Sequence, residues 1–461
     1  EAAFAQARTE KKPVLLSVGY AACHWCHVMA HESFESPEIA ALMNEHFISI
    51  KVDREERPDV DTIYQTALAL LGQQGGWPLT MFLTPEGEPF WGGTYFPPTP
   101  RHGHPAFPQV LETLSRTYRD DPERVVHSVN AIVQGLADVS AGAPGDSSSL
   151  SPPALDDMAR TALADFDLAH GGRMGAPKFP EVPLLRLLWT AHLRTGEAAF
   201  ADAVTVTLDN LCQGGIYDHL GGGFARYSTD AQWLVPHFEK MLYDNAQLVE
   251  ILGAVWRRNR SPLYARRVAE TIAWVLRDLR QPGGAFAGSL DADSEGGEGA
   301  FYVFSEAEVD SLLGAQAEPF KAAYGVTPSG NFEGRVILNR LGAMAWRGEA
   351  DEAALAEQCA VLLAVREGRP RPGLDDKILT DWNAMMIAAL ADAAAAFERA
   401  DWLTAAETAF QFIIDNLSKG GRLAHSWCAG RRADVAVLDD YAHMARAALA
   451  LYQVTGEVDY F

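Results

Sequence analysis

The sequence predicts a multidomain protein in which a small α/β domain is followed by an all-α domain of repeated helical hairpins. Three observations lead to this fold class. Strand-like and helix-like runs alternate over residues 1–139, as in an α/β domain. Residues 140–153 (SAGAPGDSSSLSPP) are small, polar and rich in Pro and Gly, as in a linker. Helical patterns rich in Ala and Leu then recur over residues 154–461.

The N-terminal region alternates apolar strand-like runs with helical runs, and it ends in two helices. A strand–helix–strand unit that is followed by a hairpin and a helix suggests a small α/β domain. The expected strands are residues 13–18, 48–53, 79–83 and 89–93, and the expected helices are residues 36–47, 63–72, 108–120 and 124–137.

The region after the linker contains helical segments that resemble one another. YDNAQLVEILGAV begins at Tyr243, DWNAMMIAALADA at Asp381 and DDYAHMARAALAL at Asp439. Each runs into a short polar connector, so that the recurring unit is a helical hairpin. Repeated hairpins with insertions favour a closed (α/α) barrel, in which the inner helices form a ring. We count about ten helical segments where a barrel of six hairpins needs twelve, and we therefore expect the barrel to be C-terminally incomplete.

Composition and charge exclude several classes of protein. The 461 residues include 61 Asp and Glu against 38 Lys and Arg, and the formal net charge of −23 opposes binding to nucleic acids or anionic lipids. No apolar run approaches the ~20 residues that cross a bilayer. The five cysteines are too few and too scattered for a secreted disulfide scaffold, and no secretory signal opens the sequence. We therefore expect a cytoplasmic protein without nucleic-acid or membrane partners.

The segment GYAACHWCHVMAHE, residues 19–32, holds a Cys-x-x-Cys pair and three histidines. The letters CHWCH match the attachment motif of c-type haem, but that motif goes with a small helical fold rather than with a strand that leads into a helix. Zinc is a second alternative, because Cys23, Cys26, His27 and His31 would lie close together on one helix. Structural zinc sites usually take ligands from two segments, however. We therefore expect no cofactor, with zinc as the alternative.

A redox-active dithiol explains this segment best. A strand that delivers Cys-x-x-Cys to a helix N-terminus is the thioredoxin arrangement, in which the helix dipole and backbone N–H groups favour a thiolate. We predict that Cys23 is the exposed nucleophile and Cys26 the buried resolving thiol. His24 and Trp25, between them, are expected to contact the substrate. Thioredoxin folds also place a cis-proline opposite the cysteines, and GGWPLTMFL offers Pro78 at that point.

Six longer motifs carry a resemblance to a known family. They are CHWCHVM, IKVDREERPDVD, GGWPLTMFLTPEGEPFWGGTYFPP, GGGFARYSTDAQWLVPHFEKMLYDNA, DDKILTDWNAMMIAALA and LDDYAHMARAAL. In this order they resemble the spermatogenesis-associated protein 20 family, and the resemblance covers nearly the whole chain. It implies a thioredoxin-like domain fused to an (α/α)6 toroid similar to six-hairpin glycosidases and N-acylglucosamine 2-epimerases. The family carries no settled activity, so the resemblance leaves the chemistry open.

Functional residues of the barrel are expected at the ends of inner helices and in the loops beside them. Sugar sites in such barrels combine aromatic rings with carboxylates or histidines. The densest segment is residues 214–246, in which we expect a helix to begin at Pro236. His237, Lys240 and Asp244 would then share one helix face. The other candidates in this segment are Tyr217, Asp218, His219, Arg226, Tyr227, Trp233 and Glu239.

Four further segments supply candidates, namely SLDADSEGG, DDKILTDWN, RLAHSWCAG and LDDYAH. The first superficially resembles a calcium loop but lacks the EF-hand spacing of the later ligands. In the second, Asp381 could simply cap a helix. The candidates from these segments are Asp291, Asp293, Asp381, Trp382, Asn383, His425, Asp440 and Tyr441.

Two classes of function follow as hypotheses. In the first, the barrel binds or converts a carbohydrate. An epimerase would need acid–base groups on opposite faces of the sugar, for which His237 and His425 are a possible pair, and a hydrolase would need two carboxylates, for instance Asp218 and Asp381. In the second, the chain is a redox or folding factor that acts on a protein partner through its dithiol and uses the barrel as a docking module.

Overall fold

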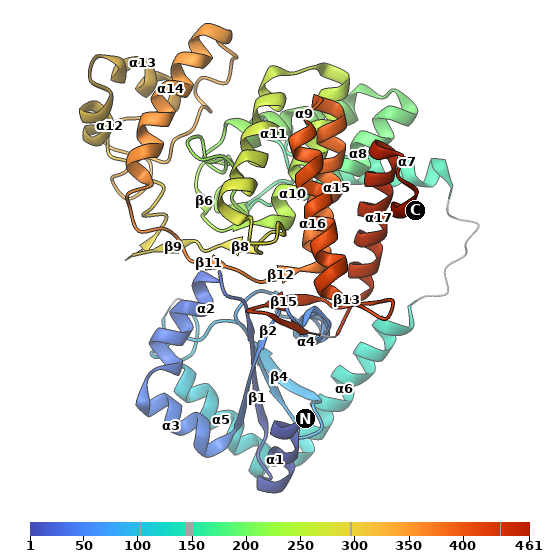
Figure 1. The fold of residues 1–461 in the computed structure, drawn as a ribbon. Helices are drawn as coiled ribbons and strands as arrows, with labels where there is room; N and C mark the ends of the chain where they lie inside the picture. The colour runs from blue at the N-terminus through green and yellow to red at the C-terminus, as the bar shows by residue number, and fades with distance from the viewer. Residues whose placement is uncertain (102, 143–150, 296, 434) are drawn as a thin grey trace. The chain divides into compact units, whose positions relative to one another are not determined.

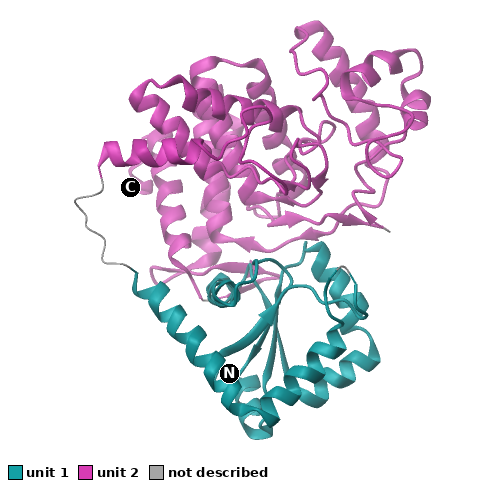
Figure 2. Ribbon diagram, turned by 180° about the vertical axis from the view of Figure 1, so that it is seen from behind, with its two compact units in different colours: residues 1–146 teal, residues 147–461 magenta. Residues whose placement is uncertain are grey.

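The computed structural model describes residues 1–101, 103–142, 151–295, 297–433 and 435–461. The chain divides into two compact units, Glu1–Asp146 and Ser147–Phe461, which Figure 2 shows in different colours. The expected linker of residues 140–153 spans this division, and residues 143–150 of it lie outside the described residues. No described helix is long and apolar enough to cross a membrane.

The first unit is built on a four-stranded mixed sheet (Figure 1). The strand β1 (Val14–Gly19) pairs in parallel with β2 (Ile48–Asp53) and antiparallel with β3 (Leu79–Leu83), which in turn pairs with β4 (Pro89–Gly93). The strand order is therefore β2-β1-β3-β4. All four strands lie where the alternation of apolar runs predicted them.

Helices pack on both faces of this sheet. Because side chains alternate along a strand, Leu15 and Phe82 enter one apolar core while Leu16 and Met81 enter the other. The helical segments are α1 (Ala2–Glu10), α2 (His24–Met29), η1 (Ala30–Phe34), α3 (Pro37–His46), α4 (Pro58–Leu70), α5 (Phe107–Asp120) and α6 (Pro122–Ala141). A strand–helix–strand unit followed by an antiparallel hairpin confirms the predicted thioredoxin-like class.

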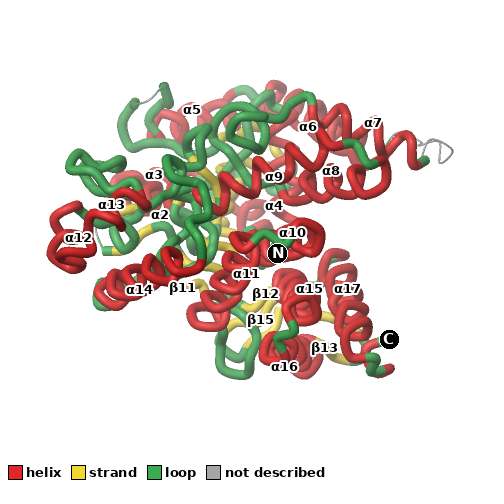
Figure 3. The backbone as a smooth tube through the Cα atoms, turned by 90° about the horizontal axis from the view of Figure 1, so that it is seen from above, coloured by secondary structure: helices red, strands yellow, loops and turns green. Residues whose placement is uncertain are grey.

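The second unit consists mainly of helical hairpins. The helices α8, α10, α15 and α17 pack side by side in this order, and α9, α11 and α16 each pack against the helix before them (Figures 1 and 3). This arrangement confirms the predicted repeat of inner and outer helices. The bounds are α7 (Pro152–Leu163), α8 (Val182–Thr195), α9 (Ala198–Gln213), α10 (Leu242–Asn259), α11 (Pro262–Trp274), α15 (Thr380–Phe397), α16 (Ala400–Leu417), α17 (Leu438–Thr455) and η5 (Val458–Tyr460).

A largely helical insertion separates α11 from α15, which explains the long interval between the second and third repeats. Its segments are η3 (Val275–Leu279), α12 (Glu306–Leu313), η4 (Gly314–Gln316), α13 (Ala317–Tyr324) and α14 (Glu349–Arg366). The insertion has an apolar core of its own, to which Phe304, Phe320 and Leu362 contribute fully buried side chains.

Short strands connect the hairpins. They are β5 (Tyr227–Ser228), β6 (Pro236–His237), β7 (Lys240–Met241), β8 (Ser289–Leu290), β9 (Asp293–Ser294), β10 (Gly297–Glu298), β11 (Leu374–Asp375), β12 (Ile378–Leu379), β13 (Ser418–Lys419), β14 (Arg422–Leu423), β15 (Ser426–Cys428) and β16 (Arg431–Ala433). The prediction of a helix from Pro236 is therefore wrong: residues 236–237 pair with β5, residues 240–241 pair with β8, and α10 begins only at Leu242.

One contact recurs between inner helices and loops. The Oδ1 atom of Asn245 in α10 accepts a hydrogen bond from the backbone N–H of Phe224 at 2.7 Å, and the Oδ1 atom of Asn383 in α15 accepts one from Phe286 at 2.8 Å. Each amide also donates to the carbonyl of the same loop residue, at 3.0 Å and 2.9 Å. Both asparagines are fully buried. Asn383 is thus a structural residue, and its prediction as a substrate-binding residue is wrong.

The third repeat makes the same contact with a different side chain. In α17 the hydroxyl of Tyr441 accepts a hydrogen bond of 3.2 Å from the N–H of Leu423. Two residues beyond the anchored position, the three loops carry Arg226, Gly288 and His425. The carbonyls of the last two accept hydrogen bonds of 2.9 Å from the first residues of α10 and α15. The repeat therefore presents a different side chain from each loop near the N-terminal ends of the inner helices.

Candidate functional site

The Cys-x-x-Cys segment lies between β1 and α2. Cys23 is the N-cap residue of α2, and its sulfur accepts a hydrogen bond of 3.2 Å from the N–H of Cys26. The two cysteines form a disulfide with their Cα atoms 5.2 Å apart. The zinc alternative, which also used His27 and His31, is contradicted, because bonded sulfurs cannot both be thiolate ligands and His31 pairs with Glu35 at 2.9 Å.

The exposure of the two cysteines differs from the prediction. Cys23 is 3% exposed, whereas Cys26 is half-buried. The N-cap position turns the side chain of Cys23 inward over the first turn of α2, where it meets the Cys26 amide. The prediction that Cys23 is the exposed sulfur and Cys26 the buried one is therefore wrong in the disulfide-bonded state.

Aromatic side chains surround a groove beside the dithiol. Trp25 is 46% exposed, its ring centroid lies 5.1 Å from that of Tyr95, and His24 is half-buried next to it. Trp25, Trp77 and Tyr95 line a cavity of about 820 Å³. The Trp77–Pro78 peptide bond is cis, as the sequence predicted. The dithiol is thus next to a hollow large enough for part of a polypeptide.

The predicted catalytic His237 is held by carboxylates on both sides. Its Nε2 lies 2.9 Å from Glu239 and its Nδ1 lies 2.6 Å from Glu298, while Arg226 pairs with Glu239 at 3.1 Å and Tyr227 stacks on the imidazole. Burial would lower the pKa of His237, but these two carboxylates raise the pKa to about 9. A histidine that stays protonated at neutral pH is a poor general base, so the catalytic role predicted for His237 is wrong.

The predicted catalytic Asp218 is also committed within the fold. Arg366 bonds both of its carboxylate oxygens, at 2.7 and 2.9 Å, and Lys240 donates to it at 2.7 Å. Burial would raise the pKa of Asp218, but Arg366 and Lys240 lower the pKa far below its usual range, while burial lowers the pKa of Lys240 to about 8. Asp218 therefore cannot exchange a proton, and its predicted catalytic role is wrong.

Three further candidates of the dense segment are buried and bonded internally. The Tyr217 hydroxyl lies 2.7 Å from Glu270, the Nε2 of His219 lies 2.9 Å from a backbone carbonyl, and the Trp233 indole donates to another carbonyl at 2.9 Å. These side chains support the loop, and their prediction as binding residues is wrong. Asp244, Asp291 and Asp293 are half-buried, and their roles stay predictions.

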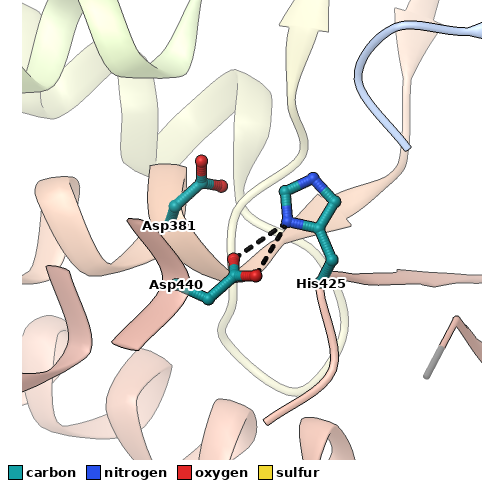
Figure 4. A group of neighbouring side chains, drawn as sticks. All are labelled: Asp381, His425 and Asp440. Carbon is teal, nitrogen blue, oxygen red and sulfur yellow. Dashed lines mark hydrogen bonds and ion pairs between the residues drawn. The ribbon is translucent and has the colours of Figure 1, made fainter. Parts of the chain in front are cut away.

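Asp381, His425 and Asp440 come together in the second unit (Figure 4). Asp381 lies in the first turn of α15, Asp440 lies in the first turn of α17, and His425 lies just before β15. The Nδ1 of His425 lies 2.9 and 3.1 Å from the two carboxylate oxygens of Asp440. All three side chains are buried, with exposures of 8%, 2% and 0% in this order.

This group can exchange protons near neutral pH. Because Nδ1 of His425 donates to the Asp440 carboxylate, the ring is oriented and its second nitrogen, Nε2, points away from Asp440 (Figure 4). Burial raises the pKa of Asp381 to about 6, with His425 opposing and Asp440 reinforcing this shift. An imidazole and a carboxyl group with such a pKa suit general acid–base chemistry.

The same side chains have donor atoms close enough for a metal ion. Ligand atoms of Asp381, His425 and Asp440 all lie within 4.8 Å of one another, and this is the metal-capable group of His, Cys, Asp and Glu found among the described residues. Two carboxylates and one imidazole would suit a divalent cation. An aromatic surface adjoins the group, since Trp382 follows Asp381 and its ring centroid lies 4.7 Å from that of Tyr243.

The sequence therefore named the members of this group but paired them wrongly. Asp381 and His425 lie with each other and with Asp440, not in the predicted pairs with Asp218 and His237. Sequence analysis missed Arg366 as the partner of Asp218, and no local pattern signals it. The repeat could have placed His425, because its loop aligns with the loops of Arg226 and Gly288 at the ends of inner helices.

Comparisons with known proteins agree with this architecture. A family model described as a protein of unknown function, DUF255 (Thioredox_DsbH), matches residues 1–137. A GH76 alpha-mannanase of Bacteroides thetaiotaomicron is similar in structure with a TM-score of 0.42 and 12% identity, covering 67% of each chain. A DsbH oxidoreductase is similar with a TM-score of 0.20 and 18% identity, covering 25% of this chain and 81% of its own.

Two relatives match almost the whole chain. Spermatogenesis-associated protein 20 of Rattus norvegicus is 34% identical over 506 residues, which are 99% of this chain and 64% of the rat protein. An uncharacterized protein of Caenorhabditis elegans is 34% identical over 502 residues, or 99% of this chain and 68% of its own length. The chain thus spans less than two thirds of the rat protein. Shared along 99% of the chain, this similarity shows that it belongs to the spermatogenesis-associated protein 20 family.

Proposed function

We propose that the chain carries two active sites of different chemistry. In the first unit, Cys23 and Cys26 exchange disulfides with a protein partner. In the second unit, Asp381, His425 and Asp440 perform acid–base chemistry on a bound carbohydrate. The observation that carries the enzymatic part is the buried His425–Asp440 pair beside a carboxyl group with a pKa of about 6.

The redox proposal is supported by the position of Cys23 at the N-terminus of α2. When the disulfide oxidises a partner, one partner thiolate attacks the sulfur of Cys23, the bond to Cys26 breaks, and Cys26 leaves as a thiolate that takes a proton. A second partner thiolate then displaces Cys23, so that two partner thiols become a disulfide and this chain holds two thiols. The Cys26 N–H at 3.2 Å stabilises the Cys23 thiolate that leaves.

Redox titration tests this step. The full chain is equilibrated in glutathione buffers of graded potential, and alkylation of Cys23 and Cys26 is followed by mass spectrometry. We expect one two-electron transition between about −270 and −180 mV. Cys26→Ser should trap mixed disulfides, whereas Cys428→Ser, at a half-buried unpaired cysteine, should leave the titration unchanged. Cysteines that stay reduced across this range would contradict the proposal.

The acid–base proposal assigns a role to each member of the group. Asp440 orients the imidazole of His425, whose Nε2 takes or returns the proton. Asp381 holds a proton in part of the molecules at neutral pH and delivers it to the substrate. Trp382 and Tyr243 would supply an aromatic surface for the apolar face of a sugar ring, as in other sugar sites.

A saccharide screen tests this second step. Neutral mono- and oligosaccharides are incubated with the full chain in D₂O and followed by NMR, which separates solvent exchange at a C–H bond (epimerase) from new reducing ends (hydrolase). Asp381→Asn and His425→Gln should abolish turnover, whereas Asp415→Asn, on the exposed face of α16, should retain it. An assay with EDTA separates acid–base from metal-assisted chemistry. If the dithiol titrates but no saccharide binds, the redox factor with a docking module is favoured instead.

A further inference from the structure

A second, strongly basic cavity lies in the helical unit, apart from the acid–base group. It has a volume of about 180 Å³ and is lined by residues of α11, η3 and α14, among them the four arginines Arg266, Arg267, Arg277 and Arg340. Such a wall is unexpected in a chain with a net charge of −23. We propose that this cavity binds the phosphate group of a small molecule.

The arginines outnumber the carboxylates that pair with them. Arg266 and Arg267 share Glu270, at 2.8 and 2.7 Å. Arg266 and Arg340 share Glu352, at 3.0 and 2.8 Å. Two carboxylates therefore serve three guanidinium groups, and the cavity keeps an excess of positive charge.

The fourth arginine lies at the rim. Arg277 pairs with Asp278 at 2.7 Å and donates to a backbone carbonyl at 2.9 Å, and its side chain is 40% exposed. Asp278 also pairs with Arg371 at 2.8 Å, so this carboxylate is shared as well. A partly exposed guanidinium above a basic cavity can turn toward an anion that enters it.

A buried donor supports a ligand in this place. Arg340 is 2% exposed, yet its Nε atom has no hydrogen-bond partner among the residues that the structure describes. A buried N–H group without an acceptor is unfavourable, and an oxyanion would supply that acceptor. His219, which also lines the cavity, accepts a hydrogen bond from Arg267 at 3.2 Å. Burial and the neighbouring Arg267 and Arg340 lower the pKa of His219 to about 3, as expected beside excess positive charge.

The size of the cavity favours a phosphate ester over a simple ion. A volume of 180 Å³ equals that of about six waters in the liquid, so the cavity has room for an oxyanion together with part of the molecule that carries it. Guanidinium groups bind phosphate oxygens through paired N–H donors. Several such groups around one cavity therefore match a tetrahedral, doubly charged group better than a planar carboxylate.

Calorimetry on the full chain tests the proposal with inorganic phosphate and glycerol 3-phosphate as probes, glycerol as the neutral control and constant ionic strength. We expect glycerol 3-phosphate to bind and glycerol not to bind. Arg277→Gln should weaken binding about tenfold, whereas Arg280→Gln, at an exposed arginine just after η3, should leave it unchanged. Ala360→Trp, which fills the mouth of the cavity and keeps every arginine, should abolish binding.

The outcomes separate the sources of the phosphate group. Equal affinity for both probes identifies free phosphate as sufficient, and tighter binding of glycerol 3-phosphate identifies an ester; either result supports the site. Binding of neither probe overturns the proposal. Binding that is lost equally in Arg280→Gln, or kept in a folded Ala360→Trp variant, also overturns it, because the affinity would then come from the surface charge and not from the cavity.

Discussion

Asn383→Ala is expected to destabilise the helical unit strongly, although Asn383 contacts no substrate. The side chain is fully buried, and it bonds both the N–H and the C=O of Phe286, at 2.8 and 2.9 Å. Alanine leaves these two backbone groups without their partner. Since each buried polar group left unpaired costs about 1–3 kcal/mol, we expect the free energy of unfolding to fall by about 3 kcal/mol.

Two measurements check this expectation on the full chain. Urea denaturation followed by circular dichroism gives the loss of stability of the transition that reports helix. Hydrogen–deuterium exchange with mass spectrometry gives the local effect, because the peptide that contains Phe286 should exchange about a hundredfold faster if opening becomes easier by ~3 kcal/mol. Asn245→Ala should do the same at Phe224. Asn416→Ala, which removes one bond of 2.9 Å from a half-buried side chain, should cost less than ~1 kcal/mol.

One result would refute the anchoring argument. If Asn383→Ala unfolds at the same urea concentration as the unmodified chain, and exchange at Phe286 stays slow, the contact stabilises nothing. Loss of saccharide binding in that same variant would then restore the original prediction that Asn383 binds substrate.

Three more predictions concern titration and backbone conformation. Because the pKa of Asp381 is raised from 3.8 to about 6, the chain should lose stability relative to Asp381→Asn as the pH rises from 4 through 6, by up to about 3 kcal/mol; urea denaturation at stepwise pH measures this, and a constant difference would contradict it. The pKa of His237 is raised from 6.5 to about 9, so the stability that this histidine contributes, about 3 kcal/mol, is complete below pH 6.5 and is lost as the pH rises through 9. His237→Gln should therefore destabilise the chain at pH 6 and much less at pH 10, and ¹⁵N NMR should show a protonated ring at pH 8. Gly222→Ala should lower thermal stability by at least about 2 kcal/mol, because φ is +81° and a Cβ would lie 2.4 Å from a carbonyl oxygen of α11; Gly253→Ala, inside α10 with open space around it, should raise stability by about 0.5–1 kcal/mol, and the opposite order would refute the assignment.

The architecture could be predicted because its signals are local. Apolar runs fixed the four strands of the first unit, and the similarity of the segments at Tyr243, Asp381 and Asp439 gave the hairpin repeat. The helix expected at Pro236 failed for a physical reason. Strands of only two residues, such as Pro236–His237, carry no alternation that a sequence pattern can register, and they form because a partner strand from a neighbouring loop is present.

The site could be predicted only as a list of residues. His425 and Asp440 are 15 residues apart, and their contact depends on how β15 pairs with β12 and how α15 packs against α17. The bond between Asp218 and Arg366 spans 148 residues and reaches into the insertion. A cluster of polar letters does not reveal which carboxylates are neutralised by such distant cations and which remain able to exchange protons.

The anchored loops divide two tasks that proteins often combine in one residue. Asn245 and Asn383 bind only the backbone of their loops, so the residue two places further on has no duty in folding and is open to change. The natural loops already differ there, with a cation at Arg226, no side chain at Gly288 and an imidazole at His425. A Cβ at Gly288 would meet the Trp382 ring at 3.5 Å, an ordinary contact. The middle loop is therefore a position at which a designer, or natural selection, can install a new reactive group on an unchanged scaffold.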